Sequence, residues 1–169
     1  TGPQKYTSYQ WIEVMETAHG LGLKTTATMM YGHVETIEER LEHLKRIRDL
    51  QDRTGGFTAF IAWPFQPKNT VLAHLDKSSA VEYLKMVSLS RLYLDNFDNI
   101  QASWVTQGPK VAQLSLSYGA NDFGSTMIEE NVVAAAGVSF RLSEQEIRRL
   151  VSEAGFAAHQ RRMDYSLVA

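Results

Sequence analysis

The 169-residue sequence contains no cysteine. It therefore forms no disulfide, and no metal ion or iron–sulfur cluster can be held by thiolates of this chain. It also lacks any apolar run that approaches the ~20 residues of a membrane-spanning helix, and no signal peptide opens it. Neither sign of charge is in large excess, because the 17 basic and 19 acidic residues give a net charge of −2. The basic residues are also spread along the chain. We therefore expect a cytoplasmic protein with no nucleic-acid and no membrane partner.

What is present is an ordinary globular composition, with 44% hydrophobic and 21% charged residues. The length suffices for one buried core, and no linker or low-complexity segment divides the chain. The sequence starts at Thr1 without methionine, so we expect a processed, tagged or truncated piece.

Apolar strands and amphipathic helices alternate along the chain. Five helices are expected from their periodicity and end signals, over residues 8–19, 36–55, 79–96, 108–119 and 143–155. Four strands are expected between them, over residues 24–31, 57–63, 99–105 and 120–122. Residues 129–131 and 134–137 are expected to be irregular or weakly helical, and the tail 157–169 to be a strand or strap.

Capping boxes mark the starts of three helices, because a Ser or Thr is followed three residues later by Glu. The pairs are Thr36 with Glu39, Ser79 with Glu82 and Ser143 with Glu146. Gly55 is expected to end the second helix. The strand at 57–63 is almost wholly apolar, which is typical of a parallel strand buried on both faces.

The recurrence of strand and helix at about 40 residues indicates an α/β fold with a parallel sheet, as in a barrel or a doubly wound sheet. A complete (β/α)8 barrel needs about 250 residues, so the four units here are either a small α/β domain or half of a barrel. A half-barrel leaves sheet edges unpaired. We therefore expect it to pair with a missing N-terminal half-barrel or to self-associate.

Polar and aromatic residues gather where the strands end, which is where barrel enzymes place their active sites. They are Met30, Tyr31, Gly32, His33, Trp63, Gln66, Asn69, Ser103, Trp104, Thr106, Gln107, Asn121, Asp122 and Ser125. A structural role stays open for each, such as a core position for the tryptophans and a turn cap for Asp122. Arg91, on an apolar helix face, either reaches solvent or binds an anion. Glu39 and His43 have metal-ligand spacing, but they lie on a charged helix face, so no metal site is expected.

Three segments carry a resemblance to a known family. Residues 26–35 (Thr-Ala-Thr-Met-Met-Tyr-Gly-His-Val-Glu), 54–61 and 119–126 resemble the radical S-adenosylmethionine enzymes of menaquinone and deazaflavin biosynthesis. Within that family, residues 63–67 and 124–133 are most similar to the branch that cyclises dehypoxanthine futalosine. The resemblance implies the second half of a (β/α)8 TIM-type barrel over residues 1–142, and a helix and strand extension over 143–169.

The resemblance also implies two cofactors, S-adenosylmethionine and a 4Fe–4S cluster, and dehypoxanthine futalosine as the small-molecule substrate. Reductive cleavage of S-adenosylmethionine would lead to ring closure of that substrate into a spirocycle. The family's cluster cysteines belong to the first half of the barrel, so this chain alone is expected to be inactive. Aminofutalosine synthase, the deazaflavin-precursor synthase, a non-catalytic half-barrel subunit and a self-contained adenosyl-binding domain remain alternatives.

Site residues follow from the family pattern and from the strand ends. Thr28-x-Met30-x-Gly32-x-x-Glu35 is similar to the family's G-x-I-x-G-x-x-E, with Thr28 in place of the first glycine. The cofactor-binding residues that this likeness implies are Met30, Gly32, Ile61 and Trp63. The substrate-binding residues expected at the strand ends are His33, Gln66, Asn69, Gln107 and Ser125. Asp122 is the candidate catalytic base.

Overall fold

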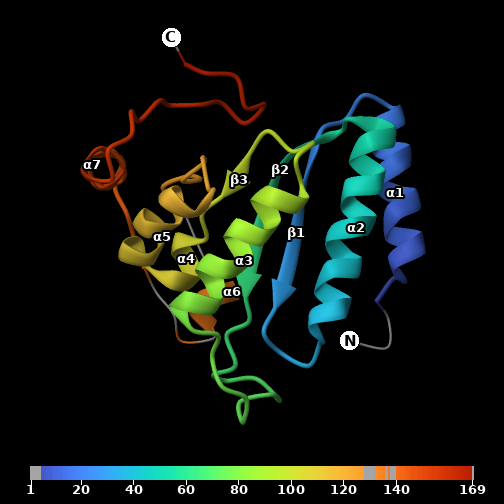
Figure 1. Ribbon diagram of the computed structural model, residues 1–169, viewed down its shortest axis with the longest axis horizontal. Helices are drawn as coiled ribbons and strands as arrows, with labels where there is room; N and C mark the ends of the chain where they lie inside the picture. The colour runs from blue at the N-terminus through green and yellow to red at the C-terminus, as the bar shows by residue number, and fades with distance from the viewer. Residues whose placement is uncertain (1–4, 128–131, 136, 138–139, 169) are drawn as a thin grey trace.

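The computed structural model describes residues 5–127, 132–135, 137 and 140–168. Its elements are α1 (Ser8–Gly20), β1 (Thr25–Tyr31), α2 (Ile37–Thr54), β2 (Phe57–Pro64), α3 (Ala80–Tyr93), β3 (Ile100–Gln101), α4 (Trp104–Gln107), α5 (Pro109–Ser115), the 3-10 turn η1 (Leu116–Tyr118), α6 (Val132–Ala135) and α7 (Glu144–Glu153). Figure 1 shows that the first two strands run in one direction between α1, α2 and α3. The segment predicted to be irregular at 129–131 lies outside the described residues.

The sheet is parallel, with the strand order β1-β2-β3, which confirms an α/β fold. In the register of β1 and β2, Thr28 pairs with Ile61, and Met30 pairs with Trp63 two residues further along each strand. Ile61 also pairs with Gln101 of β3. Asp122 extends the sheet by a single parallel bridge to Gln101.

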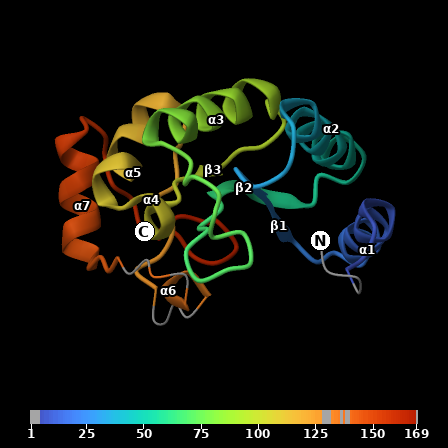
Figure 2. The same ribbon diagram turned by 90° about the horizontal axis from the view of Figure 1, so that it is seen from below.

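The long helices α2 and α3 cover one face of this sheet. Figure 2 shows α2 and α3 on the outer side of an arc, whereas α6 and the C-terminal segment lie on the inner side. In β1 the buried residues Ala27, Met29 and Tyr31 alternate with the exposed residues Thr26, Thr28 and Met30. Since side chains alternate across a strand, the first set faces the helices and the second set faces the inner side.

The core fills the space between the sheet and its helices. The α2 residues Leu44, Ile47 and Leu50 are fully buried there, against the outward-facing residues of β1 and β2. The helix α1 has its less exposed face along Trp11, Ile12, Met15, Ala18 and His19 but no fully buried residue. The outer layer is therefore complete over α2 and α3 and thinner at α1.

Most predicted helix starts are confirmed. The boxes of Thr36 with Glu39 and of Ser143 with Glu146 form as expected, and Gly55 ends α2 with a left-handed backbone. The third box is only half right. Ser79 accepts a hydrogen bond from the Glu82 N–H, but the Glu82 carboxylate turns away to Arg40, 2.8 Å distant.

The third and fourth strands were predicted too long. Only Ile100–Gln101 pairs as β3, because the Ser103 N–H donates to the Tyr83 hydroxyl (2.8 Å) and the chain then coils into α4 at Trp104. The strand predicted at 120–122 is reduced to the bridge at Asp122. The third helix ends at Tyr93 rather than near Asn96, whose side chain instead binds the Arg48 carbonyl.

Two further expectations are settled by contacts. The Arg91 guanidinium fits neither of the two expected roles, because it donates hydrogen bonds within the protein. Its acceptors are the Gly119 and Phe97 carbonyls and Asn121 Oδ1. The tail forms a strap with an antiparallel bridge between Arg161 and Leu167. Within the described ranges no helix has the length and apolarity of a membrane span, and no three potential metal ligands converge.

Candidate functional site

Two large apolar side chains lie uncovered at the ends of neighbouring strands. Met30 of β1 is 55% exposed and Trp63 of β2 is 38% exposed, and the register places them side by side on the inner face of the sheet. Adjacent exposed apolar groups of this size are a common sign of a binding surface. This pair is the centre of the candidate site.

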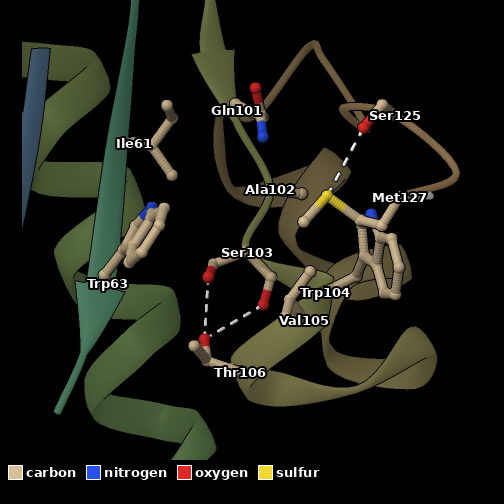
Figure 3. A pocket seen from close by; sticks show the side chains of 10 residues that line it. All are labelled: Ile61, Trp63, Gln101, Ala102, Ser103, Trp104, Val105, Thr106, Ser125 and Met127. Atoms are coloured by element: carbon tan, nitrogen blue, oxygen red, sulfur yellow. Dashed lines mark hydrogen bonds between the residues drawn. The ribbon is translucent and has the colours of Figure 1, made fainter. Parts of the chain in front are cut away.

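A cavity of about 60 Å³ lies beside the pair. It is lined by Ile61, Trp63, Gln101, Ala102, Ser103, Trp104, Val105, Thr106, Ser125 and Met127. Figure 3 shows Ile61 and Trp63 on one side of the chain that runs from Gln101 to Thr106, with Ser125 and Met127 on the other side. The structure thus brings together six residues that the sequence had singled out: Ile61, Trp63, Ser103, Trp104, Thr106 and Ser125.

Hydroxyl groups supply the polar side of the cavity. The Ser103 and Thr106 hydroxyls share a hydrogen bond of 2.7 Å, and the Ser125 hydroxyl donates to the Met127 sulfur at 3.5 Å. Ser103 and Thr106 belong to the start of α4, which begins where β3 ends, and Ser125 and Met127 follow the bridge at Asp122.

The turn after β1 is shaped by one carboxylate. Glu35 accepts hydrogen bonds from the N–H groups of Gly32 and His33 and from Arg40 Nε. Arg40 also binds Glu82 at the start of α3, so the turn is tied to two helices. Burial alone would raise the pKa of the Glu35 carboxyl, but the two N–H groups outweigh it and hold that pKa below its ordinary value.

His33 stands in this turn rather than in the first turn of a helix. Its Nδ1 lies 2.7 Å from the Val34 nitrogen and 2.9 Å from Glu35 Oε2, so the ring is held against the same carboxylate that shapes the turn. The ring meets Phe65 edge-on, with the ring centroids 5.8 Å apart. The contact joins the end of β1 to the loop that follows β2.

The other predicted substrate residues are not among those that line the cavity. Gln66 is buried and donates to the Pro64 carbonyl, and Asn69, with φ of +61°, donates to the Ala135 carbonyl. The Gln107 Nε2 is buried with no hydrogen-bond partner among the described residues. Gln66 and Asn69 therefore hold the loop over the strand ends.

Asp122 lies on the inner face and is bound by an arginine from the tail. Arg161 Nε donates to Oδ1 at 3.1 Å and Arg161 Nη2 donates to Oδ2 at 2.7 Å. The Gly124 N–H also donates to Oδ1, at 2.9 Å. The Asp122 carboxylate is therefore held by a fork of two charge-assisted hydrogen bonds.

A family comparison decides what this chain is. The sequence profile of the family described as the CofH/MqnC C-terminal region matches residues 54–169. The chain belongs to this family. The matched region of the CofH/MqnC family begins at the end of α2 and includes β2, β3, the cavity and the strap.

Individual relatives within the CofH/MqnC family have several names. A cyclic dehypoxanthine futalosine synthase of Halalkalibacterium halodurans is 51% identical, over 97% of this chain and 44% of the relative. An aminodeoxyfutalosine synthase of Thermus thermophilus is 45% identical, over 89% of this chain and 42% of the relative. A 5-amino-6-(D-ribitylamino)uracil–L-tyrosine 4-hydroxyphenyl transferase of Archaeoglobus fulgidus is 42% identical, over 98% of this chain and 50% of the relative. The chain spans about half the length of the curated relatives it matches.

The sequence-based choice of site residues in this CofH/MqnC member missed three. Gln101 precedes Ser103 by two residues, so the alternation of a strand would have placed it on the same face. Met127 lies beyond the last predicted strand end, so strand position does not single it out. Arg161 lies in the tail, where no periodic pattern indicates which residues turn inward.

Proposed function

We propose that this chain is the second half of the (β/α)8 barrel of a radical S-adenosylmethionine enzyme that cyclises dehypoxanthine futalosine in menaquinone biosynthesis. Residues 1–142 would form the half-barrel and residues 143–169 its extension. The observation that carries the proposal is the Met30–Trp63 pair, exposed at the strand ends of a chain that is 51% identical to a relative named for this synthase. The relatives with the two sibling names are less similar, at 45% and 42%.

The residues at the strand ends fit the adenosyl part of S-adenosylmethionine. A flat adenine ring can pack against Met30 and Trp63, and the backbone of Ile61 to Trp63 lies beside them for its polar edge. Gly32 begins the turn directly after β1 and adds no side chain that would block the approach of the ring. When bound, S-adenosylmethionine supplies the radical chemistry, and the protein's part is to orient the reactants and exclude water.

The described residues do not fit a 4Fe–4S cluster. The chain has no cysteine, and no three His, Asp or Glu converge in the described ranges. We therefore assign the cluster ligands to the half that precedes this segment in the relatives, and we expect the isolated chain to be inactive.

Substrate hydroxyl and carboxylate groups would meet the polar side of the cavity. Ser125 lines it, and His33, Gln66, Asn69 and Gln107 flank the strand ends in the turns and loops above. Asp122 is our candidate proton acceptor, because it is a carboxylate on the inner face that pairs in register with Gln101, a residue of the cavity lining. Unchanged turnover in an Asp122→Asn variant would exclude this role.

The proposal is tested with this chain joined to the half that precedes it, called the complete enzyme below. Anaerobic incubation with S-adenosylmethionine, a reductant and dehypoxanthine futalosine is expected to yield the cyclised product. Incubation with 5-amino-6-(D-ribitylamino)uracil and tyrosine is expected to yield none. Product from the second pair alone would instead support the transferase sibling.

The open edge of β1 supports the half-barrel part of the proposal. Thr25 N–H and the Tyr31 carbonyl bond toward β2, so the alternate residues Thr26, Thr28 and Met30 direct their backbone groups away from the sheet. A groove of about 410 Å³ lies beside Thr28, between the N-terminal segment, α1 and α2. His43 lines that groove, with its ring against the Thr28 backbone.

We infer that a further strand pairs with this edge, from the preceding half or from a second copy. Unpaired edges favour such addition. The chain by itself is expected to associate, which light scattering would detect, and a monodisperse monomer would contradict the inference.

A further inference from the structure

The end of the chain forms a compact strap, defined here as residues 160–168. The Val168 N–H donates to the Gln160 carbonyl at 2.8 Å, and the Arg162 N–H donates to the Ser166 carbonyl at 2.8 Å. The turn between them is closed by the Tyr165 N–H to the Arg162 carbonyl, with Tyr165 in a left-handed conformation. The strap is thus ordered internally by backbone hydrogen bonds.

One side chain of the strap enters the inner side of the sheet. Arg161 binds both Asp122 oxygens, donates to the Arg162 carbonyl at 3.2 Å, and packs its guanidinium over the Tyr165 ring at 3.9 Å. The side chains of the ion pair are 20% and 8% exposed. An arginine fork on a largely buried carboxylate is specific in geometry and difficult to replace.

Apolar packing contributes little to holding the strap. Met163 is 89% exposed and Leu167 is 64% exposed. No residue of the strap belongs to the hydrophobic core formed by the described residues. The Arg161–Asp122 pair is therefore the main attachment of the strap, so the strap should detach without unfolding of the domain.

The attachment point lies next to the cavity. Asp122 pairs in register with Gln101, which lines the cavity, and Ser125 follows three residues later. Figure 1 shows the strap at the end of the sheet opposite to the loop after β2, and Figure 2 shows it on the inner side of the arc. The loops occupy the mouth of the half-barrel, and the strap occupies its other end.

We propose that Arg161 is a positioning residue that fixes the Asp122 carboxylate and, through it, folds the strap into a floor beneath the substrate cavity. This inference rests on the proposed function for the identity of the substrate. Oδ1 receives both the Gly124 N–H and Arg161 Nε, which uses its two lone pairs. Oδ2 receives Arg161 Nη2 at 2.7 Å, so the fork and the Gly124 N–H together fix both carboxylate oxygens in place.

The test compares Arg161→Gln and Arg161→Lys with Arg162→Gln in the complete enzyme. Arg162 is the matched control, because among the described residues its guanidinium donates only within the strap, to the Ser166 hydroxyl (3.4 Å) and the Leu167 carbonyl (3.1 Å), and not to the sheet. Hydrogen exchange is measured by mass spectrometry for peptides covering residues 160–168 and 100–107. Arg161→Gln is expected to speed exchange at least tenfold in the strap and severalfold in the cavity peptide. Arg161→Lys, which keeps the charge without the fork, is expected to lie between it and wild type.

Activity provides a second readout. With dehypoxanthine futalosine, Arg161→Gln is expected to raise KM severalfold more than it lowers kcat, whereas Arg162→Gln leaves both unchanged. Exchange in the strap that equals wild type in Arg161→Gln would overturn the proposal. If Arg161→Gln speeds exchange in the strap but changes neither exchange in the 100–107 peptide nor KM, the strap does not form a floor of the cavity. If even the wild-type enzyme ignores dehypoxanthine futalosine, the proposed function fails, while the exchange measurements still decide the role of Arg161.

Discussion

Gly32 lies so close to Ser78 that position 32 has no room for a side chain. A β-carbon built on Gly32 would collide with the Ser78 hydroxyl, and the backbone there has φ of +84°. Ser78 is buried in the segment that leads into α3, so the contact fixes the end of β1 against the chain that follows β2. Shape therefore requires a glycine in this turn, whatever ligand approaches it.

Gly32→Ala should destabilise the protein more than Gly22→Ala. Gly22 has almost the same φ, +81°, but an added β-carbon would meet nothing within 4 Å. The left-handed backbone alone should cost about 1–2 kcal/mol. The collision should add about 1–3 kcal/mol at position 32. Denaturant unfolding of the two variants measures the difference.

The added loss in Gly32→Ala is expected to shrink when Ser78→Ala is introduced with it, because the colliding oxygen is removed. Equal stability of the Gly32→Ala and Gly22→Ala variants would show that the Ser78 contact is easily relaxed.

Glu35→Gln should destabilise the turn after β1. The carboxylate accepts two backbone N–H groups and one arginine, and hydrogen bonds to a charged group contribute about 1.5–3 kcal/mol. We expect a loss of that size near neutral pH, measured by urea unfolding. Glu42→Gln, which removes an exposed helix pair with Arg46, is the control and should change stability by less than about 1 kcal/mol.

The same residue makes stability depend on pH. Because the folded pKa of Glu35 lies below the unfolded value of 4.5, its contribution is complete above that pH and is lost as the pH falls through the folded pKa. The wild-type protein should therefore lose more stability on acidification than Glu35→Gln does. Parallel curves for the two proteins would show that Glu35 is not the group responsible.

The sequence predicted the helices better than the strand ends. The helices carry local signals, such as the Thr36–Glu39 box and Gly55, that act within a few residues of their position. The end of β3 depends instead on the Tyr83 hydroxyl, which captures the Ser103 N–H from a distant helix. A tertiary contact of this kind leaves no trace in the residues of the strand itself.

The candidate site was predictable in outline for a related reason. Met30, Ile61 and Trp63 face the inner side because strand alternation fixes the direction of each side chain. Loop residues have no such period, so Gln66 and Asn69 were expected to face a ligand but bind carbonyls of their own chain. Arg161 reaches Asp122 across 39 positions, and only the folded chain reveals that pairing.

The His19→Gln variant should lose less stability in mild acid than the wild-type protein does. The Thr54 hydroxyl donates to the Leu50 carbonyl, so it accepts from His19 Nδ1, and Nε2 accepts from the Thr25 hydroxyl. Burial, and then the charge of Lys24, lower the pKa of His19. The folded protein thus binds fewer protons than the unfolded chain, and stability falls as the pH drops below 6.5 through the folded pKa.

The measurement is urea unfolding at about pH 7 and about pH 5, which bracket the histidine titration. His19→Gln is expected to show a smaller difference between the two conditions than wild type, with the exposed His74→Gln variant as control. Some difference should persist, because burial lowers the pKa of His43 as well. A His19→Gln variant as acid-sensitive as wild type would contradict the assignment.

Met30→Ala and Trp63→Ala should weaken binding of S-adenosylmethionine to the complete enzyme without unfolding it. Both side chains are substantially exposed, so truncation leaves the core intact. Covering part of each by a ligand is worth about 1–2 kcal/mol, which corresponds to a rise in Kd of about 5–30-fold. Leu92→Ala, at an exposed site on α3, is the control and should leave the Kd unchanged. An unchanged Kd with a raised KM for dehypoxanthine futalosine would place this pair against the substrate instead.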